Sequence, residues 1–172
     1  MYVQINSESI FVPTNFALAN MKIEEIIKSN TEVSLAKKTL LNLMYTQNCT
    51  AERFNEVLKA YDLSAEQFNV LRILRGQKGN PANMSVIQER MIAKTSNTTR
   101  LVDKLLLKEL CTRKVCTVNR RKIEVFITAK GLELLAQIDP KIDDFESKWV
   151  ENLTTEELQT LNNLLEKLRT SY

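Results

Sequence analysis

Hydrophobic residues spaced three and four positions apart predict helices along most of this chain. The first stripe predicts a helix over about residues 31–61. A polar stretch at 47–50 interrupts that stripe, so the segment is either one bent helix or two. Shorter stripes predict further helices over about 64–76, 85–91 and 95–109, and again after Thr128 and after Thr154.

Two of these helices begin with a recognisable capping signal. Ser64 is followed three residues later by Gln67, and Thr154 in the same way by Glu157. In each pair the first side chain accepts from a backbone N–H of the helix, and the second accepts from the backbone N–H of the first. These pairs therefore mark two helix starts.

Between residues 85 and 109 the pattern indicates two short helices joined by a tight turn at 92–94. That arrangement is typical of a helix-turn-helix. Thr95 or Ser96 is expected to cap the second helix, which has a polar leading turn and an apolar trailing face.

After residue 110 the spacing of the apolar residues changes from a helical to a strand-like pattern. Residues 111–117 are rich in β-formers, residues 123–127 alternate between apolar and polar, and 118–121 join the two as a hairpin loop. Thr128 then caps a helix that Pro140 is expected to bend or restart. This order predicts a mainly α winged helix-turn-helix, with a small β-hairpin wing and flanking N- and C-terminal helices. Winged helices usually bind DNA.

Charge is concentrated in the same part of the chain. From Gln88 to Lys122 there are ten basic and three acidic residues, a net of +7, whereas the whole chain carries only +3. The residues before this segment sum to +1 and those after it to −5. Phosphate binding needs local positive charge, so this segment is the candidate nucleic-acid surface.

Composition removes several classes of function. The chain has no His, so serine-type triads, His-based metal sites and His general bases are excluded. Its three Cys lack paired metal-ligand spacing and indicate reduced thiols in a cytoplasmic protein. We expect them to be buried and structural, and a thiol-oxidation switch at Cys49 is the alternative. No apolar run is long enough to span a membrane. We therefore expect no catalytic residue, metal, cofactor or membrane association.

From about residue 21 to residue 168 the chain resembles the MarR family of multiple-antibiotic-resistance-type regulators. The matching stretches are DLSAEQFNVLRIL at 62–74, TTRLVDKLLLKEL at 98–110, NRR at 119–121 and ITAKGLELL at 127–135. The resemblance implies a homodimeric transcription factor whose terminal helices form the dimer interface and whose protomers each read half of a palindrome. Many members release DNA when a small aromatic acid or other lipophilic compound binds.

The resemblance also implies an organisation within one structural domain. Residues 1–20 are an irregular arm or an upstream-start extension, 21–61 an N-terminal dimerisation helix region, 62–131 the DNA-binding region and 132–172 the C-terminal dimerisation helices. The expected partners are double-stranded DNA, a second copy of the chain and a small-molecule effector. An apolar stripe on the last helix supports self-association; it comprises Leu158, Leu161, Leu165 and Leu168.

Two positions depart from the family pattern. Asn119 stands where the family wing usually has an Asp that braces an Arg, and Arg121 stands where that Arg is usual. Asn can hydrogen-bond a guanidinium but adds no charge pairing. The chain also lacks the Gly common after the recognition helix, so Glu109 must end that helix without an easy left-handed residue.

Candidate DNA contacts lie on the second helix of the helix-turn-helix and on the wing. Those on the helix are Ser96, Asn97, Thr98, Thr99, Arg100 and Lys104; those on the wing are Asn119, Arg120 and Arg121; and possible phosphate contacts are Arg113, Lys114 and Lys122. Ordinary helix capping favours the same residue types as groove contact at the start of a helix, and the spacing of Thr98 is also compatible with an inward orientation. Asp103 is expected to orient Arg100 or Lys104.

Candidate walls of an effector pocket are Tyr45, Met44, Phe54 and Phe68, all of which suit an ordinary core or dimer interface equally well. The resulting prediction is a homodimeric repressor that binds a palindromic operator and is released by a small lipophilic or aromatic ligand. A winged-helix protein–protein module without specific DNA binding is the alternative. An enzyme acting on nucleic acid would need paired carboxylates or a metal cluster near the basic segment, and none stands out there.

Overall fold

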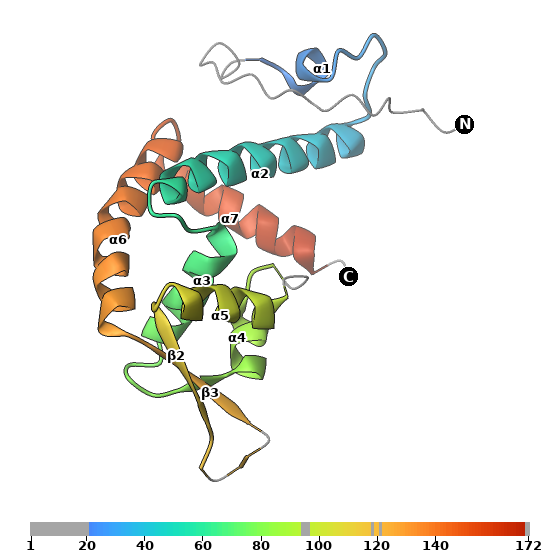
Figure 1. Cartoon of the computed structure of the whole chain (residues 1–172). Coiled ribbons are helices and arrows are strands. Elements are labelled where there is room, and N and C mark those ends of the chain that lie inside the picture. Colours follow the sequence, from blue (N-terminus) through green and yellow to red (C-terminus); the bar gives the residue numbers. More distant parts are fainter. Residues whose placement is uncertain (1–20, 94–96, 118, 121, 171–172) are drawn as a thin grey trace. The chain divides into compact units, whose positions relative to one another are not determined.

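The computed structural model describes residues 21–93, 97–117, 119–120 and 122–170. These residues form helices and short strands (Figure 1). The elements are α1 Ile23–Ile26, α2 Leu35–Lys59, α3 Ala65–Arg75, β1 Ala82–Asn83, α4 Met84–Arg90, α5 Thr98–Leu107, β2 Cys111–Val115, β3 Ile123–Ile127, α6 Ala129–Trp149 and α7 Thr155–Arg169. The mainly helical fold with a hairpin wing is confirmed. The predicted arm at 1–20 lies outside the described residues.

The chain divides into two compact units, residues 1–52 and 53–172, and the division falls inside α2. Of the two alternatives for residues 31–61, two separate helices are wrong, because α2 is one helix of 25 residues that runs through 47–50. Thr50 shows why the polar stretch is tolerated: its hydroxyl donates to the carbonyl of Thr46 one turn back, at 2.8 Å.

The core of the second unit lies around α3. That helix contacts α4, α5, α6 and β3, and it buries six of its eleven residues. On α3 the fully buried side chains include Leu71 and Leu74; the other elements add Leu58, Ile87, Leu105, Leu135 and Ile138. The end of α2 and helices α3 to α6 therefore share a single apolar interior, which holds α5 and the hairpin in place.

Local capping follows the sequence closely. The capping boxes of Ser64 with Gln67 and of Thr154 with Glu157 are both present. Thr128 caps α6 by accepting from the backbone N–H of Gly131 at 3.0 Å. The start of α5 differs from the expectation, because its cap is Asn97 rather than Thr95 or Ser96, which lie outside the described residues.

The sheet has three antiparallel strands in the order β1-β3-β2. In the predicted hairpin Cys111 pairs with Ile127, and Val115 pairs with Ile123. The third strand, β1, was not predicted, because a strand of two residues is too short to show alternation.

The turn between α5 and β2 explains how the recognition helix ends without glycine. Glu109 adopts the left-handed conformation itself, with φ of 60°. The Thr128 hydroxyl donates to the Glu109 carbonyl at 2.8 Å, and the Lys130 ammonium lies 2.9 Å from the Glu109 carboxylate. A Cβ on Gly131 would lie 2.3 Å from the Leu110 carbonyl oxygen. The start of α6 therefore packs directly on this turn and supports it.

The C-terminal helices complete the second unit. The sequence predicts that Pro140 bends or restarts its helix; a restart is wrong, because α6 runs from Ala129 to Trp149 with Pro140 inside it. α7 follows after a short connection and buries none of its residues. Among the described residues, no helix is long and apolar enough to cross a membrane.

Candidate DNA interface

Helix α5 has one face in the core and one face in solvent. Thr98, Val102 and Leu105 are buried, which fixes the helix by its inner face. The side chains left exposed are those of Thr99, Arg100, Lys104 and Leu107. Arg100, Lys104 and Leu107 are four and three residues apart, so they share one side of the helix.

The first turn of α5 separates capping from exposed chemistry. The Asn97 side-chain oxygen accepts from the backbone N–H of Arg100 at 3.1 Å, which is the capping role. Thr98 is only 6% exposed, so its side chain points inward and is not available to DNA. Its hydroxyl has no hydrogen-bond partner within the described part of the chain. Ser96 lies outside the described residues.

An ion pair joins α5 to the wing. The Arg113 guanidinium on β2 lies 2.9 Å from the Asp103 carboxylate, and both side chains are about half exposed. The expectation that Asp103 orients Arg100 or Lys104 is therefore wrong. The sequence gives little sign of this pair, because its members lie on different elements whose relative placement depends on the turn at 108–110.

The described part of the hairpin tip is closed by backbone hydrogen bonds. Cys116 donates its N–H to the carbonyl of Lys122 at 3.0 Å, and Lys122 donates to the carbonyl of Asn119 at 2.8 Å. Asn119 and Arg120 are exposed, and Arg121 lies outside the described residues. The Lys114 ammonium lies 5.7 Å from the centroid of the Phe126 ring, on the hairpin itself.

Positive charge on this surface divides into paired and unpaired groups. Lys108 pairs with Asp62 at 2.8 Å and so ties the end of α5 to the start of the α3 region; hydrogen bonding to Lys108 lowers the pKa of Asp62. Arg113 and Lys130 are also paired. Within the described ranges, five exposed cations of α5 and the hairpin form no ion pair: Arg100, Lys104, Lys114, Arg120 and Lys122. These side chains can therefore meet phosphate.

The candidate pocket residues are divided between the two units. Met44 and Tyr45 belong to the first unit, and Phe54 and Phe68 to the second. Phe68 is 2% exposed, and its ring meets Phe54 edge-on with centroids 5.8 Å apart. Phe145 meets the same Phe54 ring at 5.9 Å. Phe54 and Phe68 thus form part of an aromatic core, the alternative reading of these residues.

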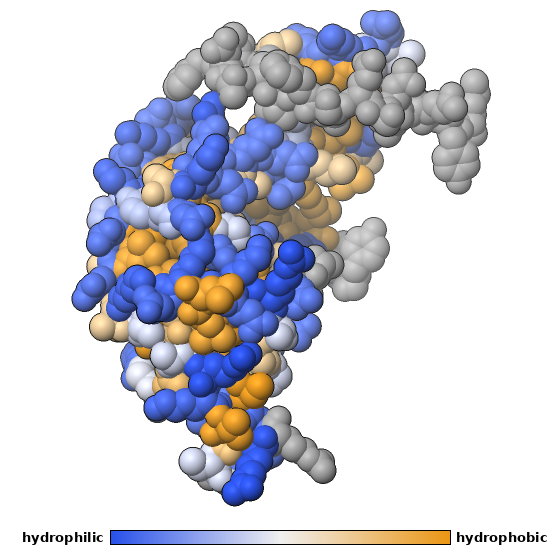
Figure 2. Space-filling view, in the orientation of Figure 1, coloured by the Kyte–Doolittle hydropathy of each residue, from blue (hydrophilic) through white to orange (hydrophobic). Residues whose placement is uncertain are grey.

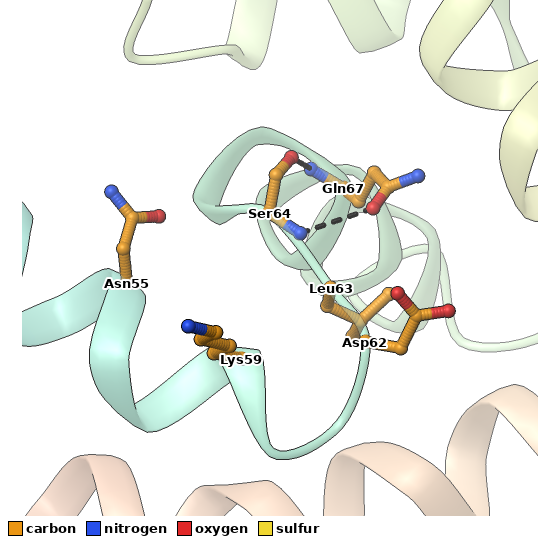
Figure 3. Close-up of a pocket in the computed structure, with 6 residues that line it drawn as sticks. All are labelled: Asn55, Lys59, Asp62, Leu63, Ser64 and Gln67. Atoms are coloured by element: carbon orange, nitrogen blue, oxygen red, sulfur yellow. Dashed lines mark hydrogen bonds between the residues drawn. The ribbon is translucent and has the colours of Figure 1, made fainter.

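An open depression of about 380 Å³ lies elsewhere, between the end of α2 and the start of α3 (Figure 3). Its lining residues are Asn55, Lys59, Asp62, Leu63, Ser64 and Gln67. The Ser64 hydroxyl and the Gln67 side-chain oxygen form the capping box, as the dashed lines in Figure 3 mark. The depression shares no residue with the predicted effector walls.

The cysteines are less uniform than expected. Cys111 is buried, and that burial raises the pKa of its thiol to about 11, which makes it unreactive at neutral pH. Cys49 and Cys116 are only half-buried, so the prediction that the thiols are buried is wrong for these two. The Tyr45 hydroxyl forms a hydrogen bond with the Cys49 side chain. Partial burial, and then this hydrogen bond, raise the pKa of Tyr45.

A helix-turn-helix with an exposed cationic helix face and an adjoining hairpin defines a winged-helix DNA-binding protein. The sequence model of the MarR family matches residues 63–123. The chain is 30% identical over 142 residues to the HTH-type transcriptional regulator YpoP of Bacillus subtilis, covering 83% of this chain and 97% of that one. The chain belongs to the MarR family.

Solved structures agree on the fold. A mutant of E. coli MarR complexed with operator DNA is similar with a TM-score of 0.66 and 24% identity, covering 73% of this chain and 89% of that one. Bordetella bronchiseptica BpsR, a protein whose DNA binding is regulated by 6-hydroxynicotinic acid, is similar with a TM-score of 0.71 and 19% identity, covering 81% of this chain and 98% of that one. Membership of the MarR family makes the protein a DNA-binding transcriptional regulator. Within the described residues, no cluster of three His, Cys, Asp or Glu could hold a metal ion.

Proposed function

We propose that this protein is a homodimeric repressor that binds a palindromic operator through α5 and the hairpin, and that a small lipophilic or aromatic ligand releases it. The observation that carries the proposal is the set of unpaired, exposed cations on α5 and at the hairpin, within a segment of net charge +7. A duplex presents regularly spaced phosphates, and such a surface matches them.

The exposed side of α5 is the major-groove element of this proposal. Thr99, Arg100 and Lys104 point away from the core, while the buried inner face holds the helix rigidly. An Arg can donate two hydrogen bonds to a guanine edge, and a Thr can contact a base or a phosphate. The side-chain oxygen of Asn97 is occupied by the helix cap. Asn97 is therefore proposed to contribute by positioning the start of α5 against DNA, not by direct contact through that oxygen.

The hairpin is the second DNA element. Arg120 and Arg121 are proposed to reach the adjacent minor groove, with Asn119 beside them. Lys114 and Lys122 are proposed as phosphate contacts. Arg113 is proposed to act mainly through Asp103, because that ion pair connects the hairpin to α5.

Self-association is supported by the surface of α7. Leu161 is 44% exposed, Leu164 59% and Leu168 40%, in a helix that buries no residue. A continuous apolar stripe of this kind is costly in water, and a second copy of the same helix can cover it. Two-fold symmetry would also place two α5 helices for the two halves of a palindrome.

The effector proposal rests on membership of the family and on the fold shared with BpsR. A ligand must favour the state that does not bind DNA by about 1–3 kcal/mol to weaken binding 5- to 150-fold. A panel of aromatic acids and phenols in a DNA-release assay tests it. If no compound changes the affinity or the melting temperature, ligand release is wrong while DNA binding stands.

The test of the DNA interface begins with duplexes selected from a random pool by the full-length protein. Arg100→Ala should weaken binding to the selected duplex by about 1–3 kcal/mol and relax the sequence preference. Arg121→Ala should cost a similar amount and flatten the salt dependence. Lys141→Ala removes the charge of an exposed side chain on α6 and serves as the control. Equal affinities for all four proteins would overturn the proposed interface and favour a protein-interaction module.

A further inference from the structure

An exposed apolar pair lies on the hairpin between the recognition helix and the wing tip. Val115 is 60% exposed and Ile123 is 37% exposed, and the two residues are direct cross-strand partners. Figure 2 shows hydrophobic groups among hydrophilic ones over the lower part of the molecule, where the hairpin projects. The described part of the chain leaves much of Val115 and about a third of Ile123 uncovered.

Strand register shows which way the pair points. Side chains alternate between the two faces of a sheet, and cross-strand partners share a face. Val115 and Ile123 therefore lie on the same face as the pairs Arg113–Val125 and Cys111–Ile127.

That face is the one on which α5 packs. Cys111 and Val125 on it are buried in the core, and Arg113 reaches the Asp103 carboxylate of α5 at 2.9 Å. The apolar pair continues this face just beyond the ion pair, where the helix no longer covers the sheet. The pair thus lies on the surface between the helix and the hairpin tip.

The surroundings of the pair are cationic. Lys122 precedes Ile123 directly and has no ion-pair partner among the described residues, and Arg120 stands at the tip. The opposite face of β2 carries Thr112 and Lys114 instead. An apolar step flanked by cations is complementary to a nucleic-acid backbone, in which apolar sugar edges alternate with phosphates.

We propose that Val115 and Ile123 pack against the deoxyribose edges of the DNA strand that passes between the major groove, read by α5, and the minor groove, entered by the hairpin. This inference rests on the proposed DNA interface and adds an uncharged contact to it. Such a contact carries no base information, so it strengthens binding to every sequence alike. It also releases no counterions, so it leaves the salt dependence unchanged.

The test substitutions are Val115→Thr and Ile123→Thr. Threonine keeps the β-branched shape that strands favour while placing a hydroxyl in the apolar contact. The matched control is Thr112→Val, the reverse exchange on the opposite, exposed face of the same strand. Lys122→Ala is the charge comparison. Melting temperatures check that each variant is folded.

Affinity is measured for the selected duplex and for a mixed-sequence duplex of about 30 base pairs, over a range of salt. Val115→Thr should weaken both complexes about four-fold per protomer, since it replaces one methyl group by a hydroxyl. Ile123→Thr also loses the terminal methyl group, so it should weaken them at least as much. Their salt slopes should equal that of the wild type, whereas Lys122→Ala should flatten the slope. Thr112→Val should bind as the wild type does.

Three other outcomes overturn the inference. If both Thr variants bind normally while Lys122→Ala is weakened, DNA binding stands and the sugar contact is wrong. If a Thr variant changes the salt slope, the pair acts through charge placement rather than by apolar contact. If the wild type binds neither duplex, the proposed function itself fails, and the exposed pair suits a protein partner instead.

Discussion

Helices α3 and α7 begin in the same way and end up in different environments. Each starts with a capping box in which the first hydroxyl accepts from the third helical N–H. Yet α3 buries six of its residues, and α7, which is longer, buries none. The comparison separates two questions: local side-chain chemistry determines where a helix starts, and only a packing partner determines whether its apolar stripe is covered.

The largest expected effect concerns the covered stripe. Leu71→Ala in α3 should destabilise the protein by about 2–5 kcal/mol, because Leu71 is fully buried and its removal leaves a cavity. Leu164→Ala in α7 is the matched change at a site that is 59% exposed in one protomer, so it should cost far less at protein concentrations that dissociate the proposed dimer. Urea unfolding at one fixed protein concentration compares them. Equal losses would mean that the α7 stripe is already covered to the same degree as the α3 stripe.

A second prediction addresses the uncovered stripe through assembly. Leu164→Glu places a charge on the proposed dimer face and should weaken self-association at least about tenfold, or about 1.4 kcal/mol. Gln159→Glu adds the same charge to α7 away from the stripe and should leave assembly unchanged. Sedimentation equilibrium measures both. A wild-type chain that is already monomeric at micromolar concentration would remove the basis of this prediction.

The two capping boxes should contribute equally despite their different surroundings. Ser64→Ala and Thr154→Ala each remove one hydroxyl acceptor, and each should cost about 1 kcal/mol of stability. Thermal unfolding of the two variants and of the wild type checks this. A much larger loss at Ser64 would show that the cap of α3 also supports core packing, beyond its local hydrogen bonds.

The smallest effect is a dependence on pH. The backbone N–H of Thr154, and then its hydroxyl, lower the pKa of Glu157 below its ordinary value of about 4.3. A depressed folded-state pKa stabilises the fold above the unfolded pKa, and this contribution is lost as pH falls through the folded value. Glu157→Gln should therefore flatten the low-pH part of the stability profile. An unchanged profile would show that the carboxylate is not the acceptor in solution.

The same distinction between local chemistry and packing explains which features could be predicted from the sequence. Ser64, Thr128 and Thr154 were predictable as helix caps because capping depends on residues three positions apart. The continuity of α2 through 47–50 could not be decided from the sequence. The Thr50 hydroxyl donates to the Thr46 carbonyl inside the helix, and such a bond leaves no periodic signal. The two-residue strand β1 exists only by pairing with β3, some forty positions later.

The candidate site shows a similar limit. The exposed cations of α5 followed from charge and helical spacing. The Asp103–Arg113 pair and the Val115–Ile123 step did not, because both depend on how the hairpin lies against α5. The inward orientation of Thr98 could be read from its spacing to Leu101 and Val102, and the structure confirms it.

The central claim is that two copies of this chain read one palindrome through α5 and the hairpin. The most direct measurement is the mass of the complex that forms on the selected duplex, by native mass spectrometry. With a chain of 19.8 kDa, we expect about 40 kDa of protein on each duplex, and less of this complex with Arg100→Ala at the same salt and concentration. A single chain per duplex, or an equal amount of complex with Arg100→Ala, would contradict this claim.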